Sequence, residues 1–247
     1  MPILNDNNMV AHKVGGSTYG FSAKRIEDLG ASEYTLGLII VDVSGSVDPY
    51  QADIEAAVKE VVRSCRRSPR ADNMMMRLVL FDDKVSEVHG YKPLSECHEA
   101  DYDGCIQIGG MTALYDAAYN GIKSATAYGR ALTEQDFDVN AAVFVITDGM
   151  DNHSTVTHSM VGDALTEAVT SESLESIVSI LIGVNTDQGG LNQYLKDLKD
   201  AAGFTEYVAI GKATVNQLAK LGGFVSRSIA SQSQALGSGG ASRSLSF

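Results

Sequence analysis

Cysteine is scarce in this chain, and tryptophan is absent. Only three cysteines, Cys65, Cys97 and Cys105, occur among 247 residues. An odd and widely spaced set of this kind does not make the disulfide framework of a small secreted domain. Because free thiols persist in a reducing compartment, we expect a cytoplasmic protein.

Basic residues and long apolar runs are also in short supply. The sequence has 19 Lys and Arg against 31 Asp and Glu, with a formal net charge of -12 and a pI near 4.7. This negative surplus repels phosphate backbones and anionic lipids, so we expect no nucleic-acid and no membrane partner. No apolar segment reaches the roughly 18 residues of a membrane-spanning helix. The first 30 residues lack the basic start and apolar run of a signal peptide.

The remaining composition, 44% hydrophobic and 20% charged, is typical of a globular domain with one sizeable core. Apolar runs alternate with amphipathic segments, which predicts an α/β fold with helices on both faces of a doubly wound, mainly parallel sheet. We expect the short strand after Asp82 to be an antiparallel edge strand. The six predicted strands are Leu36–Val43, Met74–Asp82, Val85–His89, Ala141–Thr147, Ile177–Val184 and Glu206–Ile210.

The two ends of the chain differ in composition from its middle. Residues 1–33 are polar, and we expect an irregular N-terminal segment with at most a short edge strand within Ser17–Ser22. Residues 231–247 are rich in Ser and Gly, and we expect a disordered tail. Residues 34–230 therefore form the predicted domain.

The most informative motif closes the apolar run Leu36–Val41. Asp42, Ser44 and Ser46 follow that run directly, and Pro49 opens a helix soon after. One carboxylate and two hydroxyls therefore lie at the carboxyl end of a buried strand, where open α/β sheets bind ligands. These hard oxygen ligands suit Mg²⁺, Mn²⁺ or Ca²⁺ better than Zn²⁺ or Cu²⁺.

Two further loops add oxygen ligands at the same edge of the predicted sheet. Thr112 follows a pair of glycines, Gly109-Gly110, and Asp148 ends the strand Ala141–Thr147. Each fragment alone also fits a helix cap or a turn. All three in this order, each at the right end of its element, predict one site. Its two carboxylates and three hydroxyls match a divalent cation with about six oxygen ligands, some of them water.

These motifs together resemble the metal-ion-dependent adhesion site of a von Willebrand factor type A domain. The resemblance covers about residues 35–230, and no metal position is replaced. Met111 separates the two glycines from Thr112, whereas many members have Gly next to the Thr. The resembling segments are Asp42-x-Ser44-x-Ser46, Gly110-Met111-Thr112-Ala113-Leu114-Tyr115-Asp116 and Thr147-Asp148-Gly149. The resemblance implies that the metal residues are Asp42, Ser44, Ser46, Thr112 and Asp148.

The resemblance also implies binding rather than catalysis. In the family the metal keeps one open position, which an Asp or Glu of a protein partner fills. An acidic chain without a signal peptide is similar to the bacterial stand-alone type. Members of that type often work as adaptors beside AAA+ ATPases of the MoxR kind, or in stress and phosphorylation-linked systems. The residues leave the oligomeric state open. The expected rim of the site consists of Met111, Gly149, Met150 and Asp151.

A Mg²⁺-dependent, phosphatase-like hydrolase is the alternative. A strand-end Asp with Mg²⁺ also occurs in haloacid-dehalogenase-like phosphatases, where a second Asp two residues on acts as acid and base. Ser44 stands at that position in this chain. Val43-Ser44-Gly45-Ser46-Val47 is not the Gly-x-Ser-x-Gly elbow of a serine hydrolase. We therefore expect a binding protein and no enzymatic activity.

Overall fold

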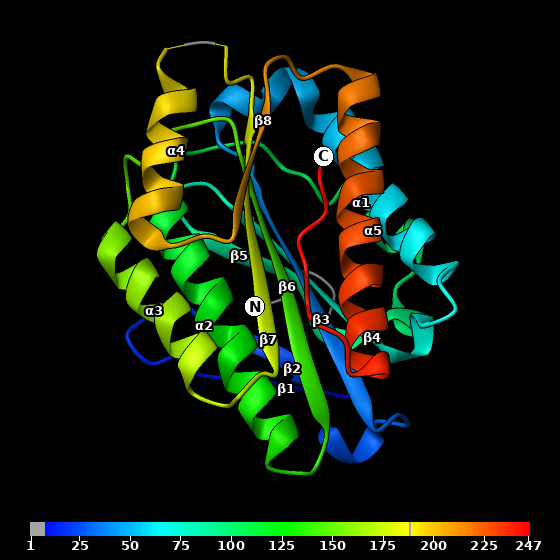
Figure 1. The fold of residues 1–247 in the computed structure, drawn as a ribbon. Coiled ribbons are helices and arrows are strands. Elements are labelled where there is room, and N and C mark those ends of the chain that lie inside the picture. The colour runs from blue at the N-terminus through cyan, green and yellow to red at the C-terminus, as the bar shows by residue number, and fades with distance from the viewer. Residues whose placement is uncertain (1–7, 188) are drawn as a thin grey trace.

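A single sheet of eight strands runs through the computed structural model, which describes residues 8–187 and 189–247 (Figure 1). The strands are β1 (Met9–His12), β2 (Phe21–Lys24), β3 (Glu33–Asp42), β4 (Met74–Phe81), β5 (Val85–Pro93), β6 (Asp138–Thr147), β7 (Ser176–Val184) and β8 (Glu206–Ile210). Their order in the sheet is β1-β2-β5-β4-β3-β6-β7-β8. The α/β architecture expected from the sequence is confirmed.

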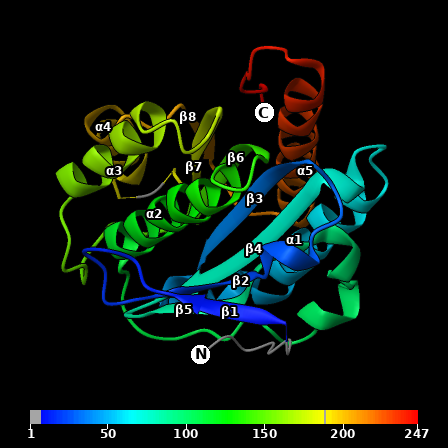
Figure 2. The same cartoon turned by 90° about the horizontal axis from the view of Figure 1, so that it is seen from below.

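The sheet is larger than the six strands expected. All six predicted strands are present, and β4, β3, β6, β7 and β8 are parallel neighbours. β5 pairs antiparallel with β4, as expected, but β5 is not an edge strand. β2 pairs with the other side of β5, and β1 forms the edge beyond it (Figure 2). Strands of four residues are too short to show a period-two pattern, so the sequence missed β1. The short edge strand expected within Ser17–Ser22 overlaps β2 only at its start, and β2 is not at the edge.

Buried polar contacts fix the β1–β2 hairpin to the sheet, so the expectation of an irregular N-terminal segment is corrected for residues 9–24. The backbone N of Ser22 donates to Glu87 Oε1 at 3.0 Å, and Arg77 Nε donates to Glu87 Oε2 at 2.6 Å. The Arg77 side chain is only 1% exposed. Gly90 allows the close approach, because a Cβ there would collide with the carbonyl oxygen of Ser22.

Five α-helices cover the two faces of the sheet. They are α1 (Gln51–Arg66), α2 (Leu114–Thr133), α3 (His158–Thr170), α4 (Leu191–Ala202) and α5 (Val215–Ser238). α1 and α5 lie on one face and α2, α3 and α4 on the other (Figure 1). Alternate residues of β3 serve the two faces, with Leu38 and Ile40 toward α2 and Ile39 and Val41 toward α1 and α5. Within residues 8–187 and 189–247, no helix has the length and apolar character to cross a membrane.

The expected disordered tail is also corrected, because α5 continues to Ser238. Gln232 and Ser233 are buried in its last two turns, and Asn140 Nδ2 donates to the Gln232 carbonyl at 2.9 Å. Gly239 then takes the left-handed conformation, with a φ of +65°, and ends the helix. A Ser- and Gly-rich composition therefore misled the prediction, since a few buried contacts suffice to order these turns.

Residues 241–247, here called the C-terminal strap, run back along α5 (Figure 1). Gln232 Nε2 donates to the Arg243 carbonyl at 2.8 Å. Leu245 packs against the core cluster on the α1–α5 face, and the Phe247 ring lies 5.5 Å from the Phe224 ring in an edge-on arrangement. The strap thus extends the apolar cover on the face that α1 and α5 share.

The three cysteines are free and buried. Cys65 lies on α1 and faces α5, with its Sγ 3.9 Å from the Ser226 carbonyl oxygen. Cys97 and Cys105 lie in the segment between β5 and α2. Burial raises the pKa of the Cys65 thiol to about 12 and those of the Cys97 and Cys105 thiols to about 11. All three thiols are therefore protonated in the folded protein at neutral pH.

Candidate metal site

Three loops bring polar side chains together at one edge of the sheet, where the parallel strands end. Asp42 is the last residue of β3, and Asp148 directly follows β6. β3 and β6 are parallel neighbours, with Val41 opposite Ile146. The polar residues that follow these positions therefore lie side by side. Thr112 comes from a third loop, just before α2.

A chain of hydrogen bonds links four of the five predicted metal residues. The backbone N of Ser44 donates to Asp42 Oδ1 at 2.9 Å. The hydroxyls of Ser44 and Ser46 lie 3.3 Å apart, and Ser46 Oγ donates to Asp148 Oδ1 at 2.6 Å. The two carboxylates thus stand at the ends of one continuous polar cluster, with both serine hydroxyls between them.

Gly149 connects the fifth residue, Thr112, to this cluster. A Cβ on Gly149 would lie 3.2 Å from Thr112 Oγ1 and 3.8 Å from Asp42 Oδ2. The glycine therefore leaves open the space between a hydroxyl and a carboxylate. Thr112 therefore lies beside Asp42, which the hydrogen bonds join to the other three predicted residues.

The donor set fits a hard divalent cation. It consists of two carboxylates and three hydroxyls, so every side-chain donor is an oxygen. In the described part of the chain, this cluster included, no group of three or more His, Cys, Asp or Glu side chains is placed to hold a metal. A cation at the five-residue cluster would therefore rely on hydroxyls and water as well as carboxylates.

Burial makes the two carboxylates difficult to ionise together. Asp42 is 2% exposed, and burial raises its pKa to about 6 against the opposing effect of hydrogen bonds from Thr147 and Ser44. The nearby negative charge of Asp148 raises the Asp42 pKa further. Burial also raises the pKa of Asp148. A bound cation would relieve both the desolvation and the mutual repulsion.

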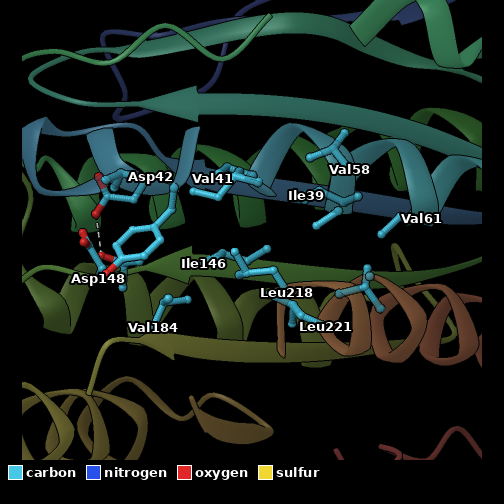
Figure 3. Close-up of a pocket in the computed structure, with 17 residues that line it drawn as sticks. Ile39, Val41, Asp42, Val58, Val61, Ile146, Asp148, Val184, Leu218 and Leu221 are labelled. Carbon is cyan, nitrogen blue, oxygen red and sulfur yellow. Dashed lines mark hydrogen bonds between the residues drawn. The ribbon is translucent and has the colours of Figure 1, made fainter. Parts of the chain in front are cut away.

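An apolar cavity beneath the cluster contributes to this desolvation. Asp42 and Asp148 lie at one end of the cavity, and aliphatic side chains of β3, β6, α1 and α5 line the rest of it (Figure 3). Its volume of about 30 Å³ would accommodate a water molecule. Most of the lining is aliphatic and offers no hydrogen-bond partner. The cavity therefore gives the two carboxylates a largely apolar surrounding on this side.

Three residues outside the predicted metal set support it. Thr147 Oγ1 donates to Asp42 Oδ2 at 2.5 Å, and Asn152 Oδ1 accepts from the backbone N of Thr112 at 2.8 Å. The Asn185 carboxamide hydrogen-bonds Asp148, and its Oδ1 accepts from the backbone N of Ala213 at 2.8 Å. Thr147 was part of the recognised motif. The signal at Asn185 was an Asn just past a strand, a residue type that tolerates the left-handed φ of +56° found there.

The expected rim residues differ in how far they face solvent. Met111 is 47% exposed and Met150 is 38% exposed, and both are large apolar side chains next to the cluster. The Asp151 carboxylate is already engaged, because its Oδ1 accepts from the backbone N of Tyr115 at 3.2 Å and from the Ser154 hydroxyl. Asp151 therefore fastens its loop to the start of α2.

No protein-family model matches the sequence, and no curated protein matches it by sequence. Solved structures with a similar fold include the PilB minor pilin of Streptococcus sanguinis, with a TM-score of 0.57 and 14% identity over 86% of this chain and 64% of the pilin. Proximal thread matrix protein 1 from the mussel byssus, with a zinc-occupied MIDAS motif, has a TM-score of 0.52 and 17% identity over 82% of this chain and 47% of that protein.

The pilus adhesin SpaC of Lactobacillus rhamnosus GG is also similar, with a TM-score of 0.58 and 10% identity over 93% of this chain and 36% of the adhesin. This chain thus spans less than two thirds of each of these three proteins. At such low identity the likeness concerns the fold alone. It supports the α/β architecture that the resemblance to von Willebrand factor type A domains implied.

Proposed function

We propose that this chain is a metal-dependent protein-interaction module of the von Willebrand factor type A kind. Asp42, Ser44, Ser46, Thr112 and Asp148 would hold one divalent cation, Mg²⁺, Mn²⁺ or Ca²⁺. The observation that carries this proposal is that these five oxygen side chains, from three loops, lie together at one edge of the sheet, with Thr112 meeting Asp42 beside Gly149. The cation would supply a Lewis-acidic position for an Asp or Glu of a protein partner.

The charge balance of the site favours a partner carboxylate. Two carboxylates leave a divalent cation with little net charge, and the three hydroxyls add none. With Asp42 or Asp148 contacting it only through water, the cation would stay electrophilic and accept an external acid. The chain itself has a net charge of -12, which repels acidic partners elsewhere on the surface. Binding of an acidic residue should therefore depend strictly on the metal.

The similar structures add limited support. One of them has a zinc-occupied MIDAS motif, which supports a divalent metal without indicating which one. The pilin and the adhesin among them are pilus proteins, which is consistent with a location outside the cell. The free cysteines favour the cytoplasm instead. An adaptor role beside a MoxR-like ATPase or in a stress system stays a prediction from resemblance.

The surroundings of Asp42 favour a binding function over the phosphatase-like alternative. This carboxylate is buried, and its two oxygens accept hydrogen bonds from the Ser44 backbone and the Thr147 hydroxyl. A nucleophile needs a free oxygen and a nearby acid, and Ser44 cannot act as that acid. Turnover of a generic phosphate ester by wild type, lost in Asp42→Asn, would favour the hydrolase instead.

Calorimetry with Mg²⁺ and with Mn²⁺ tests the metal assignment. Asp42→Ala and Asp148→Ala should each weaken affinity by at least about a hundredfold, the loss of a charged ligand. Asp48→Ala is the matched control, because it removes the same charge from an exposed position close to the site in sequence. Unchanged affinity in the first two variants would contradict the assignment.

Affinity capture from a cell extract tests the partner class. A partner held through the metal should elute with EDTA and should fail to bind the doubly substituted Ser44→Ala/Ser46→Ala protein. Replacing the partner's contacting Asp or Glu by Ala should also release it. A partner that stays bound in EDTA and to the double variant would show that recognition uses another surface.

A further inference from the structure

A groove adjoins the five-residue cluster on its Asp148 side. It has a volume of about 340 Å³ and lies between the loops that follow β3, β6 and β7 and the start of α4. It shares Ser46, Asp148 and Gly149 with the cluster. The other residues that line it are Pro49, Tyr50, Met150, Asn185, Gly189 and Leu191.

We propose, on the basis of the function proposed above, that this groove receives a bulky uncharged side chain next to the partner's metal-bound acid. The partner would be a protein segment in which an Asp or Glu has a Leu, Ile, Met, Phe or Tyr one or two positions away. The groove would thus determine which acidic segments bind, because the cation alone does not distinguish one Asp or Glu from another.

The chemistry of the groove walls carries this assignment. Pro49, Tyr50 and Met150 contribute apolar surface beside the polar groups of the groove, and Met150 is 38% exposed, whereas Leu191 is only 6% exposed. Asp148 is the one charged side chain among the described residues of the groove, and its charge would be balanced by the cation. No Lys, Arg or His of those lining residues would neutralise a second acid. An additional Asp or Glu there would be desolvated and unpaired.

The size and position of the groove fit a single neighbouring side chain. Its volume of about 340 Å³ is ample for one bulky side chain. Adjacent Cα atoms lie about 3.8 Å apart, so a residue next to an acid held at the shared cluster would reach the groove.

Peptide selection on the full chain tests the proposal. A displayed library of short peptides with one fixed Glu and random neighbours is selected in Mg²⁺ and, in parallel, in EDTA. The expected result is a set of clones that bind only in Mg²⁺. These clones should be enriched by about threefold in Leu, Ile, Met, Phe and Tyr beside the Glu, a bias of about 0.7 kcal/mol. Asp and Glu should be depleted at the same position.

A substitution in the groove provides the second measurement. Met150→Asp should weaken an enriched, metal-dependent peptide by about tenfold, because it places an unpaired charge against the apolar side chain. Val215→Asp is the matched control, since Val215 is exposed and lies outside the groove. It should change the affinity by less than about twofold, because exposed charges are screened.

The outcomes separate this inference from the proposed function. Clones that bind equally in EDTA, or no metal-dependent clones at all, would contradict the proposed function, and the inference would fall with it. Metal-dependent clones without apolar bias, or with enrichment of Lys and Arg, would overturn the inference alone. Equal losses in Met150→Asp and Val215→Asp would also overturn the inference alone.

Discussion

Among the individual residues, Asp42 connects the stability of the metal-free protein to pH. Its pKa of about 6 in the folded state lies above the usual value of 3.8. The folded state therefore binds a proton more tightly than the unfolded state, and this contribution to stability is lost as the pH rises from about 4 to about 6. Above that range the ionised group costs about 3 kcal/mol, which corresponds to a difference of about two pKa units.

Asp42→Asn should therefore stabilise the metal-free protein at pH 7 by about 2–3 kcal/mol, or about 5–10 °C in melting temperature. The amide fits the site. Its oxygen can still accept from the Ser44 backbone, and its NH₂ can donate to Thr147 Oγ1, whose hydroxyl then donates to the Gly149 carbonyl 3.2 Å away. Thermal melts from pH 4 to 8 in EDTA measure the effect.

The same variant should show no rise in melting temperature when Mg²⁺ is added, whereas wild type should show one. The difference between the two proteins in EDTA should shrink as the pH falls toward 4, because Asp42 is then protonated in the folded state and only about half ionised in the unfolded state. A difference that is constant across the whole pH range would contradict ionisation of Asp42 as its cause.

Asn185 offers a second test at this scale, because its backbone and its side chain contribute separately. Asn185→Gly and Asn185→Ala both remove the carboxamide that hydrogen-bonds Asp148, so both should weaken Mg²⁺ affinity by about tenfold. A Cβ is strained at the left-handed φ of +56°, so the Asn185→Ala variant should be less stable than Asn185→Gly by about 1 kcal/mol. Calorimetry and thermal melts measure the two effects. Metal affinities that track stability would argue against a positioning role.

At the scale of elements, the β1–β2 hairpin depends on Gly90. Gly90→Ala would push a methyl group into the Ser22 carbonyl, and this overpacking should cost about 2–3 kcal/mol. Hydrogen exchange of residues 9–24 should then quicken selectively, because the hairpin separates from β5 before the rest of the sheet opens. Gly30→Ala is the control, since a Cβ there meets nothing within 4 Å. Equal exchange in the two variants would show that the hairpin tolerates the change.

The C-terminal strap and the end of α5 should contribute to stability in steps. Truncation after Gly240 removes Leu245 and Phe247, and should lower the melting temperature by about 2–4 °C, or roughly 1 kcal/mol. Truncation after Ser231 also removes the buried Gln232 and Ser233, and should lower it by about 5–10 °C. A change below about 1 °C after the longer truncation would show that neither part stabilises the fold.

For the molecule as a whole, long periodic segments were the predictable part. Apolar runs predicted the buried strand at Leu36–Val43 and its parallel neighbours. Their alternation with helices along the chain predicted the α/β architecture. The hairpin at residues 9–24 did not, because contacts such as Ser22 with Glu87, which join residues distant in sequence, hold it in place. The end of α5 was missed for the same reason, since its buried groups contact Asn140.

The candidate site shows the same division. Its five oxygen residues follow strands or precede a helix, so topology alone predicted that they would meet. The groups that orient them were not predictable in this way. Asn152 reaches the Thr112 backbone, and Asn185 reaches Asp148, across loops whose conformations the sequence pattern does not encode. Nor does any motif reveal the groove beside Asp148, which exists only after three loops have folded together.

The three buried thiols have a kinetic consequence. A protonated, enclosed thiol reacts with an alkylating reagent only during moments of exposure, so the labelling rate of each cysteine reports how often its surroundings open. Cys65 would report the parting of α1 from α5, and Cys97 and Cys105 would report opening of the segment between β5 and α2. Alkylation of the native cysteines, followed by mass spectrometry, would therefore measure the opening rates of two separate regions without any introduced cysteine.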